Sequence, residues 1–130
     1  MGGGALRNDG GGTLQLQNTI LNASGLGGSI NNISATVISH GYNLCSDNGG
    51  GFLTASGDQI NANPQLDPLQ DNGGPTFTRR LVTGSPAINA GDPNFTPPPL
   101  YDQRGPGYDR VVGGRIDIGS FELQPEHPHP

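Results

Sequence analysis

Hydrophobic residues in this chain occur in short runs, where they alternate with polar residues between glycine-rich turns. The β-prone runs of the first half are Thr13–Leu16, Thr19–Leu21, Ala35–Ser39, Tyr42–Cys45 and Phe52–Thr54. An alternation with a period of two residues is typical of a strand with one buried face, and no segment has helical spacing. The pattern predicts an all-β chain with little helix, with Leu14 and Leu16 on the buried face of one strand.

The glycine turns of the first half recur at a similar spacing. They lie at residues 10–12, 27–28 and 49–51, about 20 residues apart, with no helical segment between them. Many of the twelve asparagines, including Asn18, Asn43 and Asn61, stand at the ends of β-prone runs, where their amides can stabilise turns. These features predict that residues 1–62 form the coils of a β-solenoid.

Residues 63–123 show no repeat. Proline follows Asn63, Asp67, Gly74, Ser85 and Asp92, so the chain is interrupted every few residues. We expect an irregular cap that forms one folding unit with the coils. Within it, Arg115–Leu123 reads as a strand with a bulge at Gly119-Ser120. Residues 124–130 are rich in proline and are predicted to be a disordered tail.

Composition and charge exclude several classes of protein. Glycine and proline number 23 and 12 of 130 residues, which would suit disorder, but only 13% of residues are charged. The net charge is −5 with six arginines and no lysine, so neither nucleic acid nor an anionic membrane is an expected partner. No apolar run is long enough for membrane insertion. The single Cys45 rules out an internal disulfide and is predicted to be a buried apolar residue.

The second half resembles a known family. The motifs NPQL, LQDNGGPT, GSPAINAGD, DQRG and RIDIGSFE occur in that order between Asn63 and Glu122, with GYNL upstream at Gly41–Leu44. In this order they are similar to the choice-of-anchor Q domain of bacterial surface and secreted proteins. The resemblance implies the last two to four coils of a right-handed parallel β-helix, closed by an irregular C-terminal cap, at the cell surface or outside a bacterial cell.

Acidic residues are concentrated in the C-terminal part of the chain. Asp102, Asp109, Asp117 and Glu122 are interleaved with arginines, so we expect mutual salt bridges that brace a loop. Asp102, Asp109 and Asp117 are weaker candidates for a calcium site, and no other cofactor is expected. The residues predicted to have structural roles are Asn43, Asn72, Gly73, Asp92, Asp102, Arg104, Asp117 and Glu122.

The sequence offers no catalytic residues, because no set of nucleophile, base and oxyanion donors can be assembled from it. We therefore expect a non-catalytic structural and interaction module in adhesion or surface display, whose partners would be surface glycans or a host protein. Two alternatives remain: a carbohydrate-binding module or remnant of a polysaccharide-degrading β-helix, and a self-assembling filament subunit.

The N-terminal edge of the predicted coils is expected to be a site of self-association. An end coil exposes unpaired backbone groups, and segments 2–4 and 8–12 are too small and polar to shield Leu14 and Leu16. With the cap covering the other end, the expected product is a symmetric end-to-end dimer.

Overall fold

The computed structural model describes residues 6–22, 28–32 and 35–124, and its regular secondary structure is almost entirely β. The strands are β1 Leu6–Asn8, β2 Thr13–Leu16, β3 Ile20–Leu21, β4 Ile30–Asn32, β5 Thr36–Ser39 and β6 Leu44–Cys45. A single 3-10 turn, η1 at Gly49–Gly51, is the helical element of these residues. None of the described helical structure is long and apolar enough to cross a bilayer. The predicted all-β class is confirmed.

The six strands form three parallel pairs with an almost constant offset. β1 pairs with β4, β2 with β5 and β3 with β6. Leu6 faces Ile30, Thr13 faces Thr36 and Ile20 faces Leu44, so that partners are 24, 23 and 24 residues apart. Leu44 also forms a parallel bridge with Gln59, one level further on. The chain therefore passes the same place three times, and we call residues 6–22, 28–45 and 46–62 the first, second and third pass.

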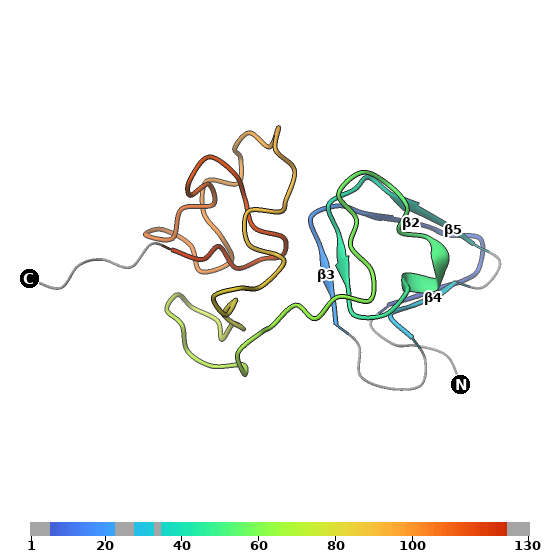
Figure 1. The fold of residues 1–130 in the computed structure, drawn as a ribbon, viewed down its shortest axis with the longest axis horizontal. Coiled ribbons are helices and arrows are strands. Elements are labelled where there is room, and N and C mark those ends of the chain that lie inside the picture. Colours follow the sequence, from blue (N-terminus) through green and yellow to red (C-terminus); the bar gives the residue numbers. More distant parts are fainter. Residues whose placement is uncertain (1–5, 23–27, 33–34, 125–130) are drawn as a thin grey trace, which may run out of the picture.

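The backbone of the three passes forms a ring with the sheets along its sides (Figure 1). Apolar side chains from these passes form the first core. Its buried members are Leu16, Leu21, Ile30, Cys45 and Leu53. In β2, Leu16 is buried and Leu14 half-buried while Thr13 and Gln15 are exposed, as the alternation predicted. The prediction of a buried Cys45 is likewise confirmed. The run Phe52–Thr54 is not a strand, because η1 turns the chain just before it and Leu53 enters the core from an irregular segment.

The described residues after 62 form isolated bridges in place of strands. Leu66 pairs with Leu81 and Gln70 with Thr78 in an antiparallel sense. The predicted bulged strand over Arg115–Leu123 is wrong, because the backbone N–H groups of this segment donate to scattered loop carbonyls and to side-chain carboxylates. Alternation also fails there, since Asp117 and Glu122 are as buried as the apolar residues around them.

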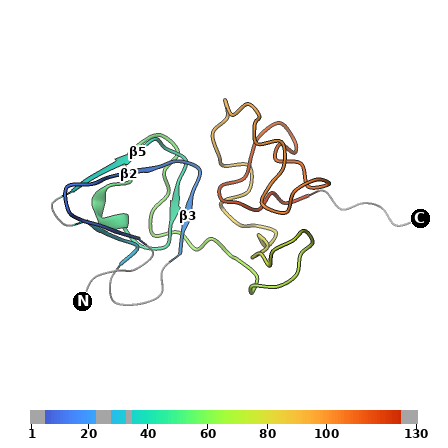
Figure 2. The same ribbon diagram turned by 180° about the vertical axis from the view of Figure 1, so that it is seen from behind.

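The C-terminal region (residues 63–124) lies beside the three passes, as Figures 1 and 2 show from opposite sides. Gly119 N–H donates to the Asn18 carbonyl in the first pass, Arg115 lies over the Tyr42 ring in the second, and Gln59 of the third donates to the Pro86 carbonyl. A cap was expected over the end of the last coil. The contacts instead run along the flank, where the outward-facing apolar side chains of β3 and β6 need cover.

A second apolar core fills this flank. It contains Leu44, Leu81, Ala87, Ile118 and Phe121, with Ile20 packed against it. Gln124, predicted to belong to the disordered tail, donates hydrogen bonds to the carbonyls of Asp109 and Glu122. The rest of that predicted tail, residues 125–130, lies outside the described residues.

Candidate functional site

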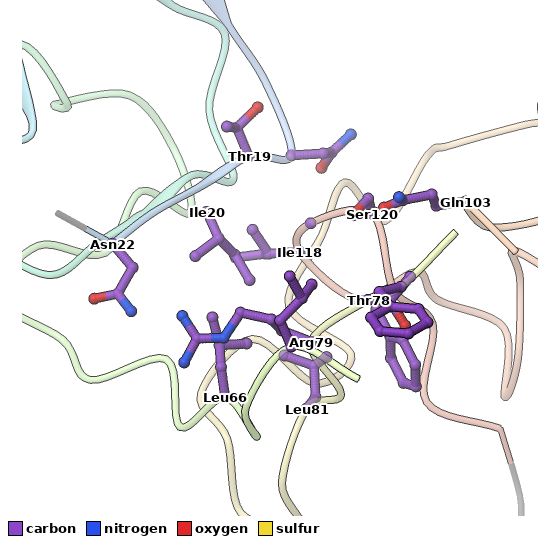
Figure 3. Close-up of a pocket in the computed structure, with 15 residues that line it drawn as sticks. Thr19, Ile20, Asn22, Leu66, Thr78, Arg79, Leu81, Gln103, Ile118 and Ser120 are labelled. Atoms are coloured by element: carbon purple, nitrogen blue, oxygen red, sulfur yellow. Dashed lines mark hydrogen bonds between the residues drawn. The ribbon is translucent and has the colours of Figure 1, made fainter. Parts of the chain in front are cut away.

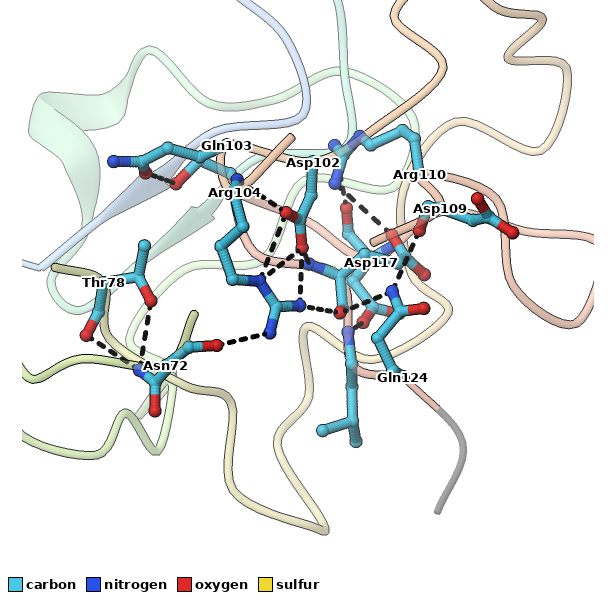
Figure 4. A network of polar contacts seen from close by, with 12 residues as sticks. Asn72, Thr78, Asp102, Gln103, Arg104, Asp109, Arg110, Asp117 and Gln124 are labelled. Carbon is cyan, nitrogen blue, oxygen red and sulfur yellow. Dashed lines mark hydrogen bonds and ion pairs between the residues drawn. The ribbon is translucent and has the colours of Figure 1, made fainter. Parts of the chain in front are cut away.

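Arg104 stands at the centre of a buried polar network in the C-terminal region (Figure 4). Its Nη2 and Nε donate to Asp102 Oδ2 over 2.7 and 3.1 Å, and both side chains are 5% exposed or less. The guanidinium carbon lies 4.0 Å from the centre of the Tyr108 ring and 3.8 Å from that of Phe121. A two-pronged ion pair between two aromatic rings is a strong, geometrically specific contact.

The same guanidinium links three loops that are distant in sequence. It donates to the Glu122 carbonyl over 2.9 Å and to the Asn72 carbonyl over 3.2 Å. Asn72 in turn donates to the carbonyl and hydroxyl oxygens of Thr78, both over 3.0 Å. Gly73 has φ +96°, and a Cβ there would lie 1.9 Å from the Tyr108 hydroxyl, so this turn requires glycine.

A second buried pair lies beside the first. Arg110 Nη1 donates to Glu122 Oε1 over 3.3 Å, and the same oxygen accepts the Asp117 N–H over 2.8 Å. The Asp117 carboxylate accepts the backbone N–H groups of Asn89 and Leu123 over 2.7 and 2.8 Å. The side chains of Asp117 and Glu122 therefore accept the backbone N–H groups that neighbouring strand carbonyls would accept in a sheet, and so hold the irregular loops in place.

Glu122 is unusual because burial raises its pKa to about 8, an effect that the nearby Asp117 carboxylate reinforces. The Asp117 N–H and the Arg110 guanidinium oppose this rise and do not cancel it. Its Oε2 is buried and has no hydrogen-bond partner among the described residues. Burial therefore favours the protonated form of Glu122, because a neutral acid costs less to bury than a carboxylate, while the contact with Arg110 favours the ionised form.

Asn43, one of the residues expected to have a structural role, contacts all three passes. Its Oδ1 accepts the Thr19 N–H of the first pass over 3.1 Å, and its Nδ2 lies within 3.3 Å of the Leu16 carbonyl and 3.1 Å of Asp58 Oδ1 in the third. The side chain is fully buried. Asp58 accepts four hydrogen bonds at this corner, including those from the Asn43 and Ala55 N–H groups.

Sequence reasoning missed Asp58 and Asp47. Asp47 accepts the N–H groups of Ser29 and Gly49 over 2.7 and 2.8 Å. Burial alone would raise the pKa of Asp47, but hydrogen bonds from Gly49, Cys45 and Ser29 outweigh it and lower the pKa. Burial raises the pKa of the Cys45 thiol beside it. Both aspartates lie beside glycine turns, which was the available signal.

Asp92 connects the two regions. Its carboxylate accepts the Asn94 N–H over 2.8 Å and the side-chain amide of Gln17 over 3.3 Å, while its own N–H donates to Asn18 Oδ1 over 2.9 Å. Gln17 and Asn18 belong to the first pass. This predicted structural residue thus forms a turn and fastens that turn to the flank of the strands.

The calcium candidates do not converge on one point. The oxygens of Asp102 accept from Arg104 and the Glu122 N–H, those of Asp117 accept from backbone N–H groups, and Asp109 is exposed. Within residues 6–22, 28–32 and 35–124, no three His, Cys, Asp or Glu side chains form a group that could hold a metal ion. The bracing expected of Asp102, Arg104 and Asp117 is made by two ion pairs, Asp102–Arg104 and Glu122–Arg110. Asp117 belongs to neither pair and accepts backbone N–H groups.

A groove of about 710 Å³ lies between the first pass and the C-terminal region (Figure 3). Ile20, Leu66, Leu81 and Ile118 point toward one another within it, and Asn22, Gln103 and Ser120 lie farther out. Leu69 and Phe77 also line it, although they are 64% and 62% exposed.

None of the predicted site residues lines this groove. The sequence did contain a signal for it. Leu69 and Phe77 stand on either side of the turn at residues 72–75, and both lie next to the Gln70–Thr78 bridge.

Comparisons with protein-family models, with curated proteins and with solved structures gave no match.

Proposed function

We propose that this chain is the end of a right-handed parallel β-helix and serves as a non-catalytic structural and interaction module outside a bacterial cell, in adhesion or surface display. The nearly constant offset of 24, 23 and 24 residues between parallel partners carries the proposal. Three faces that advance by the same interval are what stacked coils produce, with each coil burying the apolar side of the next.

The C-terminal region supports this role. The motifs that resemble the choice-of-anchor Q domain supply Arg104, Asp102, Gly73 and Glu122, and these residues join loops to one another. Contacts of this kind fix the loops relative to one another, and the charged groups of Asp102, Arg104 and Glu122 are buried away from solvent. His40 is exposed and its Nε2 lies 2.7 Å from Gln15 Oε1, a surface contact between the first and second passes.

Duplicating one coil would test the architecture. A second copy of residues 6–29 inserted before Leu6 adds one full register interval that can pair with the first pass, so the variant should fold and have a higher melting temperature. A copy of residues 6–17 alone, the matched control, adds only half an interval, so its strands find no partner in register and the melting temperature should stay unchanged. Equal effects of the two insertions would show that the passes are not repeating units.

Binding measurements test the interaction role. Fluorescently labelled chain is added to cultured epithelial cells before and after treatment with protease or with glycosidase. Loss of binding after one treatment identifies a host protein or a surface glycan as the partner. Failure to bind any cell surface would leave the structural role and contradict adhesion. The proposal also predicts no cleavage of pectin or alginate, and turnover abolished by His40→Ala would contradict it.

Self-association through the first pass remains part of the proposal. The Thr13 and Gln15 backbone groups face away from β5, and no described residue bonds to them. Exposed strand edges of this kind pair with other edges. Light scattering over a range of protein concentrations would detect the dimer, and a strict monomer at millimolar concentration with protected Thr13 and Gln15 amides would contradict it.

A further inference from the structure

We propose that the groove between β3 and the C-terminal region binds an extended peptide segment of another protein, in which an acidic residue stands next to an apolar one. The proposal rests on the interaction role proposed above and adds the place and the chemistry of the partner. Three separate features of the groove support it: a free strand edge, an apolar lining and one unneutralised cation.

The strand edge belongs to β3. Leu44 and Ser46 donate to the carbonyls of Thr19 and Leu21, so these carbonyls point toward β6. The N–H and C=O of Ile20, the residue between them, point the opposite way, and no described residue bonds to either. An extended backbone laid along this edge would satisfy both groups, as in recognition by strand addition.

The lining favours apolar side chains. Leu81 and Ile118 are 1% exposed or less and form the inner part of the groove, while Leu69 and Phe77 stand mostly exposed at its border. An apolar residue of the added strand would cover Ile20 and bury both exposed side chains. A sugar ring would instead place hydroxyl groups against Leu81 and Ile118, where few partners could satisfy them.

The charge favours an acidic residue. Among the residues that the structure describes, Arg79 is the only charged one that lines the groove. Its Nε donates to the Asp67 carbonyl over 2.9 Å, while the Asp67 carboxylate lies 3.6 Å from Arg80, so no described carboxylate pairs with Arg79. In a chain of net charge −5, an unneutralised guanidinium beside an apolar groove selects for a carboxylate.

The test uses a small set of labelled hexapeptides in which valine alternates with threonine. One apolar position is varied among valine, isoleucine, leucine and phenylalanine, and the neighbouring polar position is glutamate or glutamine. Binding to the full chain is followed by fluorescence anisotropy. We expect at least one glutamate peptide to bind about 5-fold more tightly than its glutamine counterpart, the gain of one partly exposed ion pair. Hydrogen exchange at the Ile20 amide should slow when the peptide is bound.

Two variants locate the site. Phe77→Ser should weaken binding about 10-fold, while Leu100→Ser, a change at a residue that is also 62% exposed but outside the groove, should not. Arg79→Gln should abolish the preference for glutamate and leave the glutamine peptide unaffected. Melting temperatures of all three should match the wild type, because these side chains are exposed.

Four results would overturn the proposal. No binding by any peptide at millimolar concentration would exclude an extended peptide, and binding without slower exchange at Ile20 would exclude strand addition. Binding of tri-galacturonate in competition with the peptides, sensitive to Phe77→Ser, would assign the groove to an acidic glycan. Self-association that Phe77→Ser abolishes would assign it to a second copy of the chain. None of these depends on the coil-duplication result, so the two proposals fail separately.

Discussion

The two regions of this molecule are held together by different interactions. Residues 6–62 are joined by parallel backbone ladders at a nearly constant offset, and they supply all the buried members of the first apolar core. Residues 63–124 have only isolated bridges, and buried side chains bond to backbone groups in place of neighbouring strands. Among the described residues, the two buried ion pairs, those of Arg104 and Arg110, both lie in the second region, while Arg7–Asp9 in the first region and Arg80–Asp67 in the second are at least partly exposed.

The glycine-rich sequence of this chain thus specifies structure in two ways, through repeated backbone ladders and through individual buried side-chain contacts. In a ladder, each hydrogen bond resembles its neighbours, so the loss of one is partly absorbed by the rest. In the C-terminal region each contact is unique, and a buried charge that loses its partner has no substitute. Single substitutions should therefore have larger effects in residues 63–124, and the following predictions test that expectation.

The largest effect is expected for Arg104→Ala. Removing this side chain leaves Asp102 charged and buried, which should lower the free energy of unfolding by about 3–5 kcal/mol. Arg104→Lys keeps the charge but loses the two-pronged contact, so its free energy of unfolding should lie between those of the wild type and Arg104→Ala. The matched control is Arg7→Ala, whose exposed pair should be worth under about 1 kcal/mol. Urea denaturation measures all three, and equal losses for Arg104→Ala and Arg7→Ala would remove the contrast between the regions.

Asn43→Ala should show the largest polar effect in the N-terminal region. It leaves the partly buried Thr19 N–H and the buried Leu16 carbonyl without their side-chain partner, which should cost about 1–3 kcal/mol. Asn48→Ala is the control, since Asn48 is exposed and caps only the turn at Gly50. It should cost about 1 kcal/mol or less. A larger loss for Asn48→Ala would contradict the linking role of Asn43.

The regions should respond to pH in opposite directions. Glu122 has a raised pKa, so its contribution to stability is fully present below its ordinary value of 4.5 and is lost as pH rises through about 8. The pKa of Asp47 is lowered, so its contribution is present above its ordinary value of 3.8 and is lost as pH falls below it.

Melting temperatures between pH 3 and 9 check both signs. Glu122→Gln keeps the shape and should flatten the decline toward pH 8, while Asp47→Asn should flatten the decline at the acid end. If Glu122→Gln leaves the alkaline decline unchanged, then Glu122 is ionised in the folded protein and the assignment of its proton is wrong.

Calcium should have the smallest effect. The oxygens of Asp102 and Asp117 already accept hydrogen bonds from guanidinium and backbone donors, so 5 mM Ca²⁺ should move the melting temperature by less than about 1 °C. A rise of several degrees that Asp109→Asn abolishes would show a calcium site in the C-terminal region and replace bracing by salt bridges with bracing by a metal.

Several residues of the buried polar contacts could be named from the sequence, because their residue types and positions suit few roles other than structural ones. Asp102 and Arg104 were expected to brace a loop because acidic residues and arginines are interleaved there, and Asn43 was expected to stabilise a turn because it stands near a β-prone run. Gly73 was expected from a motif of the family that the chain resembles. The pairing of Glu122 with Arg110 was not, because interleaved charges allow several pairings and only the folded loops select one.

The sequence by itself determined the all-β class, the alternation in β2, the buried Cys45 and the turn residues. Each of these depends on neighbours a few positions away, through side-chain direction, φ preference or a local hydrogen bond. Tertiary structure decided that Arg115–Leu123 is not a strand, that the C-terminal region covers the flank of the passes, and that a groove opens beside Ile20. These features depend on which distant segments meet, because a backbone N–H donates to any well-placed oxygen and an apolar face packs against any surface that excludes water.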